Sequence, residues 1–315
     1  MSKNINYVIL GAGQLGLAIM DELVAKGHEV TIANRSTKLN EKLPKSVKLI
    51  QFDASDPDQV ERVSKDAHIV FFCVQPPYHL WPALFPKLTA SVLEGVSRTN
   101  AKLVFGSNVY LYGDPNGALI HEGLPAAAKT IKGAVRAKMA KMLLDAHATG
   151  KVEVVIGRGS DFFGPRVRNS AMGDRLFQAA LEGKTADLLG DVNLPHTYTY
   201  IRDFARALIT LSQQDEAYGR AWHVPNAPTG TTQDFIDLIE AELGHPVKVR
   251  ASGALMVRLL GLFNPVIREL HELMYEFQKP FVVDHSQFVA QFGNDVTPHK
   301  QAIQETVEWY RQYAR

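Results

Sequence analysis

Short apolar stretches alternate with longer stretches of helical periodicity through the first half of the chain. Residues 5–10 are mostly apolar, and Leu15, Ile19 and Leu23 follow at the spacing of one helix face. Such alternation predicts a parallel sheet covered on both faces by the helices that connect its strands, the doubly wound α/β class. We expect further strands at 29–33, 47–52, 69–74, 102–106 and 152–157, and helices at 57–65, 80–96 and about 130–149.

The pattern is less regular after residue 157. Thr231 and Asp234 have the spacing of a capping box at the start of a helix, and Asp203 is expected to cap an earlier helix. The stretch 254–276 is apolar with scattered charge and is expected to form a pair of lid or dimer helices. We expect helices at 172–183, from near 203, at 235–243 and after Pro298, and a strand at 194–200.

Three glycines follow the first apolar run with the spacing G-x-G-x-x-G and lead directly into a helical pattern. In this context the first glycine permits a tight turn, the second lets a pyrophosphate approach the backbone, and the third lets helix and strand pack closely. The free N–H groups at the start of the helix attract phosphate. We therefore predict a dinucleotide site at Gly11, Gly13, Gln14, Leu15 and Gly16.

The second strand ends in Asn34, Arg35 and Ser36. A site that prefers NAD has a carboxylate about 20 residues beyond the glycines, where it binds the ribose 2′-hydroxyl. Asn34 stands at that place, and Arg35 can pair with a 2′-phosphate through two N–H groups. These residues favour NADP as the cofactor, with NAD as the alternative. Arg35 could instead be an ordinary solvated arginine of the loop with no role in binding.

Two carboxylates follow the third strand. Asp53 is placed to accept a hydrogen bond from the adenine amino group or to remain in the loop, whereas Asp56 before Pro57 is typical of a helix cap. Val74 and Gln75 end the fourth strand, at the edge of the sheet where ligands bind in open α/β folds. We add Asp53, Val74, Gln75 and Ser107 to the expected cofactor site.

Composition narrows the class of protein. The 315 residues suffice for about two domains, and a net charge of +1 gives no general attraction to nucleic acid or to an anionic membrane. The single cysteine, Cys73, excludes an internal disulfide and is consistent with a cytoplasmic protein. We find no apolar run of the length of a membrane span, no cleavable signal and no metal-binding cluster of Cys and His.

Beyond the glycines, four segments resemble the extended short-chain dehydrogenase/reductase family, which includes sugar-nucleotide epimerases and dehydratases. They are 105–113 (FGSNVYLYG), 158–165 (RGSDFFGP), 198–207 (YTYIRDFARA) and 219–224 (GRAWHV). The resemblance implies a Rossmann domain at 1–157 and a smaller C-terminal α+β substrate domain at 158–315, with segments near 190–222 returning to the first. It also implies a substrate cleft between them, a small oxygenated substrate of sugar or carbonyl type, and a homodimer.

The chain departs from the catalytic motif of that family. The family uses a Ser or Thr after the fifth strand and Tyr-x-x-x-Lys on the next helix, where the tyrosine transfers a proton and the lysine lowers its pKa. No tyrosine occurs from Gly113 to Asp187. One alignment places Lys132 and Arg136 on the two positions, and a second places Ala134 and Lys138 there. We prefer the first, although a solvated cationic helix face is an equal alternative.

The missing tyrosine leaves three interpretations open: an atypical reductase or epimerase, an NADP sensor without turnover, and a structural dinucleotide-binding subunit. Asn108, with Ser107 beside it, falls on the serine position. Other candidates for proton transfer are Tyr110, Tyr112, Asp161 and Lys132, with Arg136 as a hydrogen-bond donor. Candidates for substrate binding are Phe162, Arg166, Arg168 and His196.

Overall fold

The computed structural model describes residues 5–39, 41–253, 257 and 271–313. The chain forms two compact units, and each is described by itself. Unit 1 comprises Met1–Leu111, Lys132–Arg158 and Phe204–Val224, and unit 2 comprises Tyr112–Ile131, Gly159–Asp203 and Pro225–Arg315. Most of the stretch 254–276, for which paired helices were predicted, lies outside the described residues.

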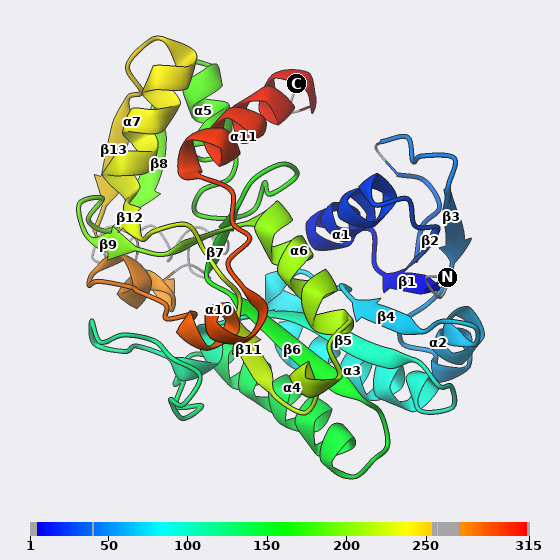
Figure 1. Cartoon of the computed structure of the whole chain (residues 1–315). Coiled ribbons are helices and arrows are strands. Elements are labelled where there is room, and N and C mark those ends of the chain that lie inside the picture. The colour runs from blue at the N-terminus through cyan, green and yellow to red at the C-terminus, as the bar shows by residue number, and fades with distance from the viewer. Residues whose placement is uncertain (1–4, 40, 254–256, 258–270, 314–315) are drawn as a thin grey trace. The chain divides into compact units, whose positions relative to one another are not determined.

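Unit 1 contains a seven-stranded sheet with the order β11-β6-β5-β4-β1-β2-β3 (Figure 1). Strand β1 pairs in parallel with both β2 and β4, and Ile9 lies between Ile32 and Phe71. These side chains are fully buried, which explains why the strands read as continuous apolar runs. The strands are β1 (Tyr7–Leu10), β2 (Val30–Asn34), β3 (Val47–Gln51), β4 (Ile69–Phe72), β5 (Lys102–Asn108), β6 (Val154–Gly159) and β11 (Ala221–His223).

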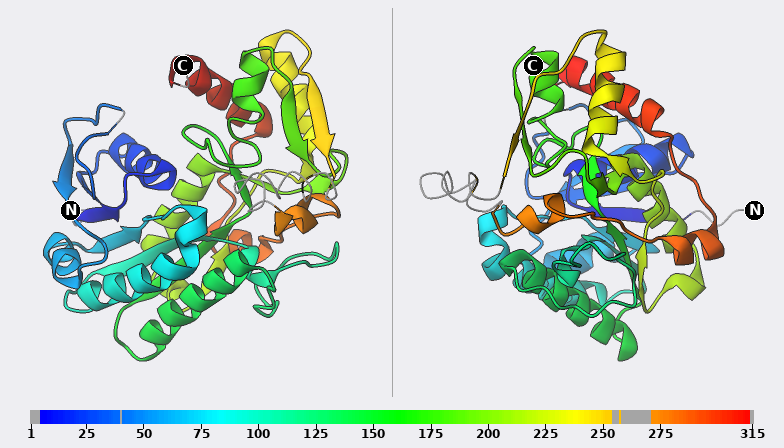
Figure 2. Two further views of the ribbon diagram at one scale, coloured as in Figure 1. Left: turned by 180° about the vertical axis from the view of Figure 1, so that it is seen from behind. Right: turned by 90° about the vertical axis from the view of Figure 1, so that its left-hand side faces the viewer.

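Helices cover both faces of this sheet, with α1 and α6 on one face and α2, α3 and α4 on the other (Figures 1 and 2). The doubly wound α/β prediction is therefore confirmed. The cap of α2 is also as predicted, because the Asp56 carboxylate accepts hydrogen bonds from the N–H groups of Asp58 and Gln59. The helices are α1 (Gln14–Ala25), α2 (Pro57–Ser64), α3 (Trp81–Val96), α4 (Ile131–Ala148) and α6 (Ile201–Ser212), with short 3-10 helices η1 (Tyr78–Leu80), η2 (Tyr110–Tyr112) and η3 (Asp215–Ala217).

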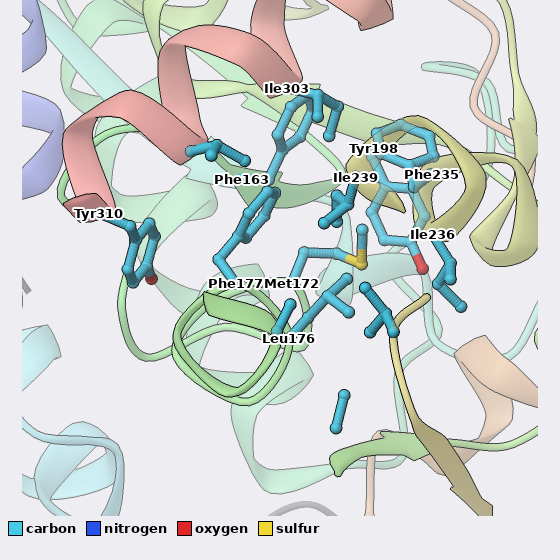
Figure 3. Packing of buried hydrophobic residues seen from close by; sticks show 14 of the residues in the cluster. Phe163, Met172, Leu176, Phe177, Tyr198, Phe235, Ile236, Ile239, Ile303 and Tyr310 are labelled. Atoms are coloured by element: carbon cyan, nitrogen blue, oxygen red, sulfur yellow. The ribbon is translucent and has the colours of Figure 1, made fainter. Parts of the chain in front are cut away.

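The described residues of unit 2 form three short strand pairs and several helices around an apolar core (Figure 3). Phe163, Phe177, Phe235 and Ile303 meet in this core and are almost completely buried. The pairs are β7 (Asp161–Phe163) with β10 (Tyr198–Tyr200), β8 (Ala186–Leu189) with β13 (Val249–Ser252), and β9 (Pro195–His196) with β12 (Gly230–Thr231). The helices are α5 (Phe177–Leu181), α7 (Thr232–Leu243), α10 (Ser286–Phe292) and α11 (His299–Tyr313), with 3-10 helix η4 (Met274–Phe277).

Local signals predicted some elements of unit 2 and missed others. Thr231 and Asp234 form the expected capping box at the start of α7. The helix predicted at 172–183 is much shorter, because the chain around Gly173 forms turns that hydrogen-bond back to Arg168. Asp203 is not a cap: it lies in the first turn of α6, and its carboxylate accepts hydrogen bonds from Thr297.

Candidate active site

The glycine loop lies at the carboxyl ends of β1 and β4. Gly11 has a φ of +108°, and a Cβ there would stand 3.0 Å from the backbone of Cys73 and Val74. Its N–H donates to the carbonyl of Ala33 at the end of β2. The chain reverses its direction of strand addition between β1 and β4, which is the point where open α/β sheets bind ligands.

The other two glycines differ in their surroundings. A Cβ on Gly16 would overlap the carbonyl oxygen of Gly11, so this glycine is needed for the close packing of α1 on β1. A Cβ on Gly13 would meet no atom within 4 Å, and the backbone of Gly13 is extended, with a φ of −80°. Gly13 is therefore not needed for packing, and its open side is free for a ligand.

The start of α1 has the features of an anion site. Gly13 is the N-cap, and it has no side chain with which to accept a hydrogen bond from the first turn. The first turn also contains no acidic residue. The N–H groups of Gln14, Leu15 and Gly16 precede the first intrahelical bond, so they and the helix dipole are directed at the open side of Gly13.

Asn34 connects this loop to the end of β2. Its side-chain oxygen accepts a hydrogen bond from the N–H of Ala12 at 3.2 Å, and its amide nitrogen donates to the carbonyl of Ser36 at 2.8 Å. The Ser36 hydroxyl in turn accepts a hydrogen bond from the N–H of Lys38. Asn34 and Ser36 therefore shape the loop that presents the exposed side chain of Arg35.

A surface hollow of about 480 Å³ lies beside Arg35. Asp53 is within it, and its carboxylate accepts hydrogen bonds from the N–H and the hydroxyl of Ser55. Both hydrogen bonds lower the pKa of Asp53, the one from the Ser55 N–H having the larger effect, so the carboxylate is charged at neutral pH. Sequence reasoning missed three polar residues of the hollow: Gln51 at the end of β3, and Gln59 and Arg62 on α2. The lining residues are Arg35, Gln51, Phe52, Asp53, Gln59 and Arg62.

The two cationic candidates on α4 point inward. Lys132 is 2 % exposed and Arg136 is 5 % exposed. The guanidinium carbon of Arg136 lies 4.4 Å from the centroid of the Trp81 ring and 4.9 Å from that of Phe85. The Lys132 ammonium lies 5.4 Å from the centroid of the Tyr78 ring. A solvated cationic helix face is therefore the wrong interpretation of these two residues.

Arg136 is buried without a carboxylate partner among the described residues. Its Nε is buried and makes no hydrogen bond. Burial lowers the pKa of its guanidinium to about 10, so the charge is retained at neutral pH. The nearby Tyr78 and Tyr110 phenols raise this pKa, by less than burial lowers it. Because an uncompensated buried charge is costly, this arrangement is typical of a functional site.

The remaining unit 1 candidates lie at the ends of β4 and β5. Ser107, Asn108 and Tyr110 are all buried, and the Asn108 side-chain oxygen accepts a hydrogen bond from the N–H of Tyr110. Val74 is half-buried, and Gln75 is exposed. Unit 1 thus brings the glycine loop and the ends of these strands to one edge of its sheet.

The unit 2 candidates include a buried pair. His196 Nε2 and Asp161 Oδ2 are 2.9 Å apart, and both side chains are less than 10 % exposed. The His196 ring stacks on Phe277 and on Tyr198, with centroids 5.0 Å and 4.4 Å away. The sequence assigned the two residues to different roles, proton transfer and substrate binding, and gave no signal that they touch.

The other substrate candidates of unit 2 are less enclosed. Phe162 is half-buried, and Arg166 adopts a φ of +68°, which is uncommon for a residue with a side chain. Arg168 pairs with both carboxylate oxygens of Asp174 at 3.1 Å. Arg168 therefore already serves as an ion-pair partner within unit 2.

Burial raises the pKa of the Cys73 thiol, which keeps it protonated at neutral pH. In the described ranges, no group of three or more His, Cys, Asp and Glu side chains has the arrangement of a metal site. No helix in these ranges has both the length and the apolarity needed to cross a membrane.

Known proteins resemble the chain over nearly its whole length. UDP-N-acetyl-alpha-D-glucosaminuronate decarboxylase of Bacillus cytotoxicus is 23 % identical, with 96 % of each chain covered. The structure of dTDP-glucose 4,6-dehydratase from Bacillus anthracis in complex with NAD has a TM-score of 0.80 and 16 % identity, over 98 % of this chain and 97 % of that one. UDP-glucuronic acid 4-epimerase from Bacillus cereus, also in complex with NAD, has a TM-score of 0.81 and 16 % identity, over 99 % and 100 %.

The solved structures share the fold at low identity, and the family is shown by a separate match. The model of the NAD dependent epimerase/dehydratase family matches residues 7–224, which include the glycine loop, the end of β5 and all of α4. This agrees with the resemblance drawn from the sequence motifs. The chain belongs to the NAD-dependent epimerase/dehydratase family.

Proposed function

We propose that this protein is an NADP(H)-dependent oxidoreductase or epimerase that acts on a small oxygenated substrate of sugar or carbonyl type. The observation that carries the proposal is the uncapped start of α1, where Gly13 leaves free N–H groups open to a pyrophosphate. The named relatives act on sugar nucleotides or bind NAD, which supports the same class of reaction.

The choice of NADP over NAD rests on the hollow beside β2. Arg35 and Arg62 both line it, and Asn34 supplies no negative charge that would repel a 2′-phosphate. An arginine can bind such a phosphate through paired N–H groups. Asp53, in the same hollow, is the proposed acceptor for the adenine amino group.

Cofactor titration tests this proposal. NADPH and NADH are titrated into the protein, with binding followed by cofactor fluorescence, and NADPH is expected to bind more tightly. Arg35→Ala should weaken NADPH about 10- to 100-fold, the effect of losing hydrogen bonds to a charged group, and leave NADH nearly unchanged. Arg311→Ala, an exposed arginine of unit 2, is the control. Equal affinity for both cofactors in the parent protein would contradict the NADP assignment.

The missing tyrosine of the family motif favours one alternative, a redox sensor that binds NADP(H) without turnover. The two functions are separated by measuring oxidation of bound NADPH against panels of carbonyl compounds and sugar nucleotides. Consumption of NADPH with any of them identifies an enzyme. Tight binding without consumption, together with a protein partner whose affinity depends on the cofactor's redox state, identifies the sensor.

We also propose that the protein acts as a homodimer. Leu80 and Leu84 are 36 % and 37 % exposed and lie one helical turn apart at the start of α3, which supports an apolar contact there. Sedimentation velocity should give twice the 34.9 kDa mass of one chain. Leu84→Glu should shift the protein towards the monomer, whereas a parent protein that sediments as a monomer contradicts the proposal.

A further inference from the structure

One phenol of unit 1 lies beside both buried cations of α4. The Lys132 ammonium lies over the Tyr78 ring, and the Tyr78 phenol raises the pKa of Arg136. The Tyr78 ring also packs against the Trp81 ring, with centroids 4.8 Å apart and a tilt of 30°, and Trp81 in turn packs against the Arg136 guanidinium. The two cations are thus linked through two adjoining aromatic side chains, Tyr78 and Trp81.

Tyr78 stands on a loop whose position is well defined. It follows β4 after two consecutive prolines, Pro76 and Pro77, which restrict the backbone. The indole N–H of Trp81 donates to the carbonyl of Pro76 at 3.0 Å and is fully buried. The loop leaves the carboxyl edge of the sheet beside the glycine loop, because β4 is paired with β1 there.

We propose that the hydroxyl of Tyr78 is the proton donor and acceptor of the reaction, and that Lys132 and Arg136 stabilise its phenolate form. A residue from the loop after β4 then performs the proton transfer for which α4 has no tyrosine. Arg136 cannot itself exchange protons near neutral pH, so its part is electrostatic. Both cations are positioning residues, and Tyr78 is the catalytic residue.

The proton and electron balance of the step is simple. In the oxidative direction the carbon-bound hydrogen of a secondary alcohol leaves as hydride, with two electrons, for the nicotinamide ring of NADP⁺. The alcohol proton passes to the phenolate oxygen of Tyr78, and the substrate becomes a ketone. In the reductive direction NADPH returns the hydride and the Tyr78 hydroxyl returns the proton. The step therefore rests on the proposed function, which supplies the nicotinamide.

Exposure favours Tyr78 over the neighbouring tyrosines. Tyr110 and Tyr112 are 8 % and 6 % exposed, whereas Tyr78 is half-buried and therefore more exposed than either. The described groups near Tyr78 include two cations from α4, Lys132 and Arg136. A positive charge nearby favours the anionic form of a phenol.

The kinetic test compares single hydroxyl deletions. Tyr78→Phe should lower kcat about 10²- to 10⁴-fold, the usual contribution of a general acid or base, with the NADPH dissociation constant changed less than about twofold. Tyr218→Phe, which removes a hydroxyl bonded to the Ser212 carbonyl elsewhere in unit 1, is the control. An unchanged kcat in Tyr78→Phe, or the loss of activity in Tyr110→Phe alone, would overturn the proposal.

A second test needs no substrate. The ultraviolet absorbance of phenolate is followed against pH in the parent protein and in Tyr78→Phe, and the difference isolates Tyr78. In Arg136→Met the Tyr78 transition should move to higher pH, whereas Arg136→Lys should restore most of the parent position. Lys132→Met provides a second arm if Arg136→Met does not fold. A Tyr78 transition that both deletions leave unmoved overturns the proposal, whereas failure to bind NADPH refutes only the proposed function.

Discussion

The side-chain oxygen of Asn34 accepts a hydrogen bond from the N–H of Ala12, between the first two glycines of the loop. This bond fixes the glycine loop to the end of β2, and the Asn34 amide also donates to Ser36. The residue that occupies the position of the usual carboxylate therefore orders the glycine loop and carries no charge.

Asn34→Asp should reverse the cofactor preference. The carboxylate keeps an acceptor for Ala12 but loses the donor to Ser36 and repels a 2′-phosphate, so NADPH should bind at least about tenfold more weakly. NADH should bind more tightly, because the carboxylate can accept from the 2′-hydroxyl. Asn34→Ala, which removes both hydrogen bonds without adding charge, should weaken both cofactors alike. An unchanged ratio of affinities in Asn34→Asp would argue against an adenosine ribose at this position.

Gly13→Ala and Gly16→Ala should separate binding from stability. A methyl group at Gly13 meets no protein atom within 4 Å, so the melting temperature should be unchanged while both cofactors bind at least about tenfold more weakly. A methyl group at Gly16 overlaps the Gly11 carbonyl and should destabilise the protein by about 1–3 kcal/mol, the usual cost of overpacking. Thermal unfolding and fluorescence titration measure the two effects. Unweakened binding in Gly13→Ala would place the pyrophosphate elsewhere.

Removing one partner of the Asp161–His196 pair should affect the stability of unit 2. Asp161→Ala leaves His196 buried under Phe277 and Tyr198 without its partner, and is expected to cost about 3 kcal/mol. Chemical denaturation measures this loss, and NADPH affinity is the control because the proposed cofactor site lies in unit 1. A variant that is fully stable but inactive would instead assign Asp161 to proton transfer.

The stability of unit 2 should also depend on pH through Glu305. Burial by itself raises the pKa of this carboxyl group. Its carboxylate, however, accepts a hydrogen bond from the Tyr200 hydroxyl and pairs with Arg202 at 2.8 Å, and such interactions lower the pKa overall. A carboxyl group whose pKa is lowered by folding stabilises the fold at pH values above 4.5, its ordinary pKa. This contribution is lost as the pH falls through the pKa of the folded state. The difference in unfolding free energy between the parent and Glu305→Gln should therefore shrink below about pH 4.5. A difference independent of pH would show that the charge of Glu305 is unimportant.

Local signals in the sequence predicted the structural features that depend on neighbouring residues. The glycine spacing, the apolar run before it and the helical pattern after it together identified the loop, because a tight turn and close helix packing restrict which residues fit. The caps at Asp56 and Thr231 were predictable for the same reason, since each side chain bonds to backbone within its own first turn.

The sequence by itself determined the order of strands and helices, the glycine loop and the departure from the family's tyrosine motif, because each is expressed in contiguous residues. Only the tertiary structure decided which distant side chains meet: Tyr78 with Lys132, Arg136 with Trp81, and Asp161 with His196. The physical reason is that apolar periodicity specifies which side of an element is buried. It does not specify which residue of another element packs against that side. A lysine or arginine in a helical pattern is therefore expected to be solvated, and only the tertiary structure shows that aromatic rings surround it.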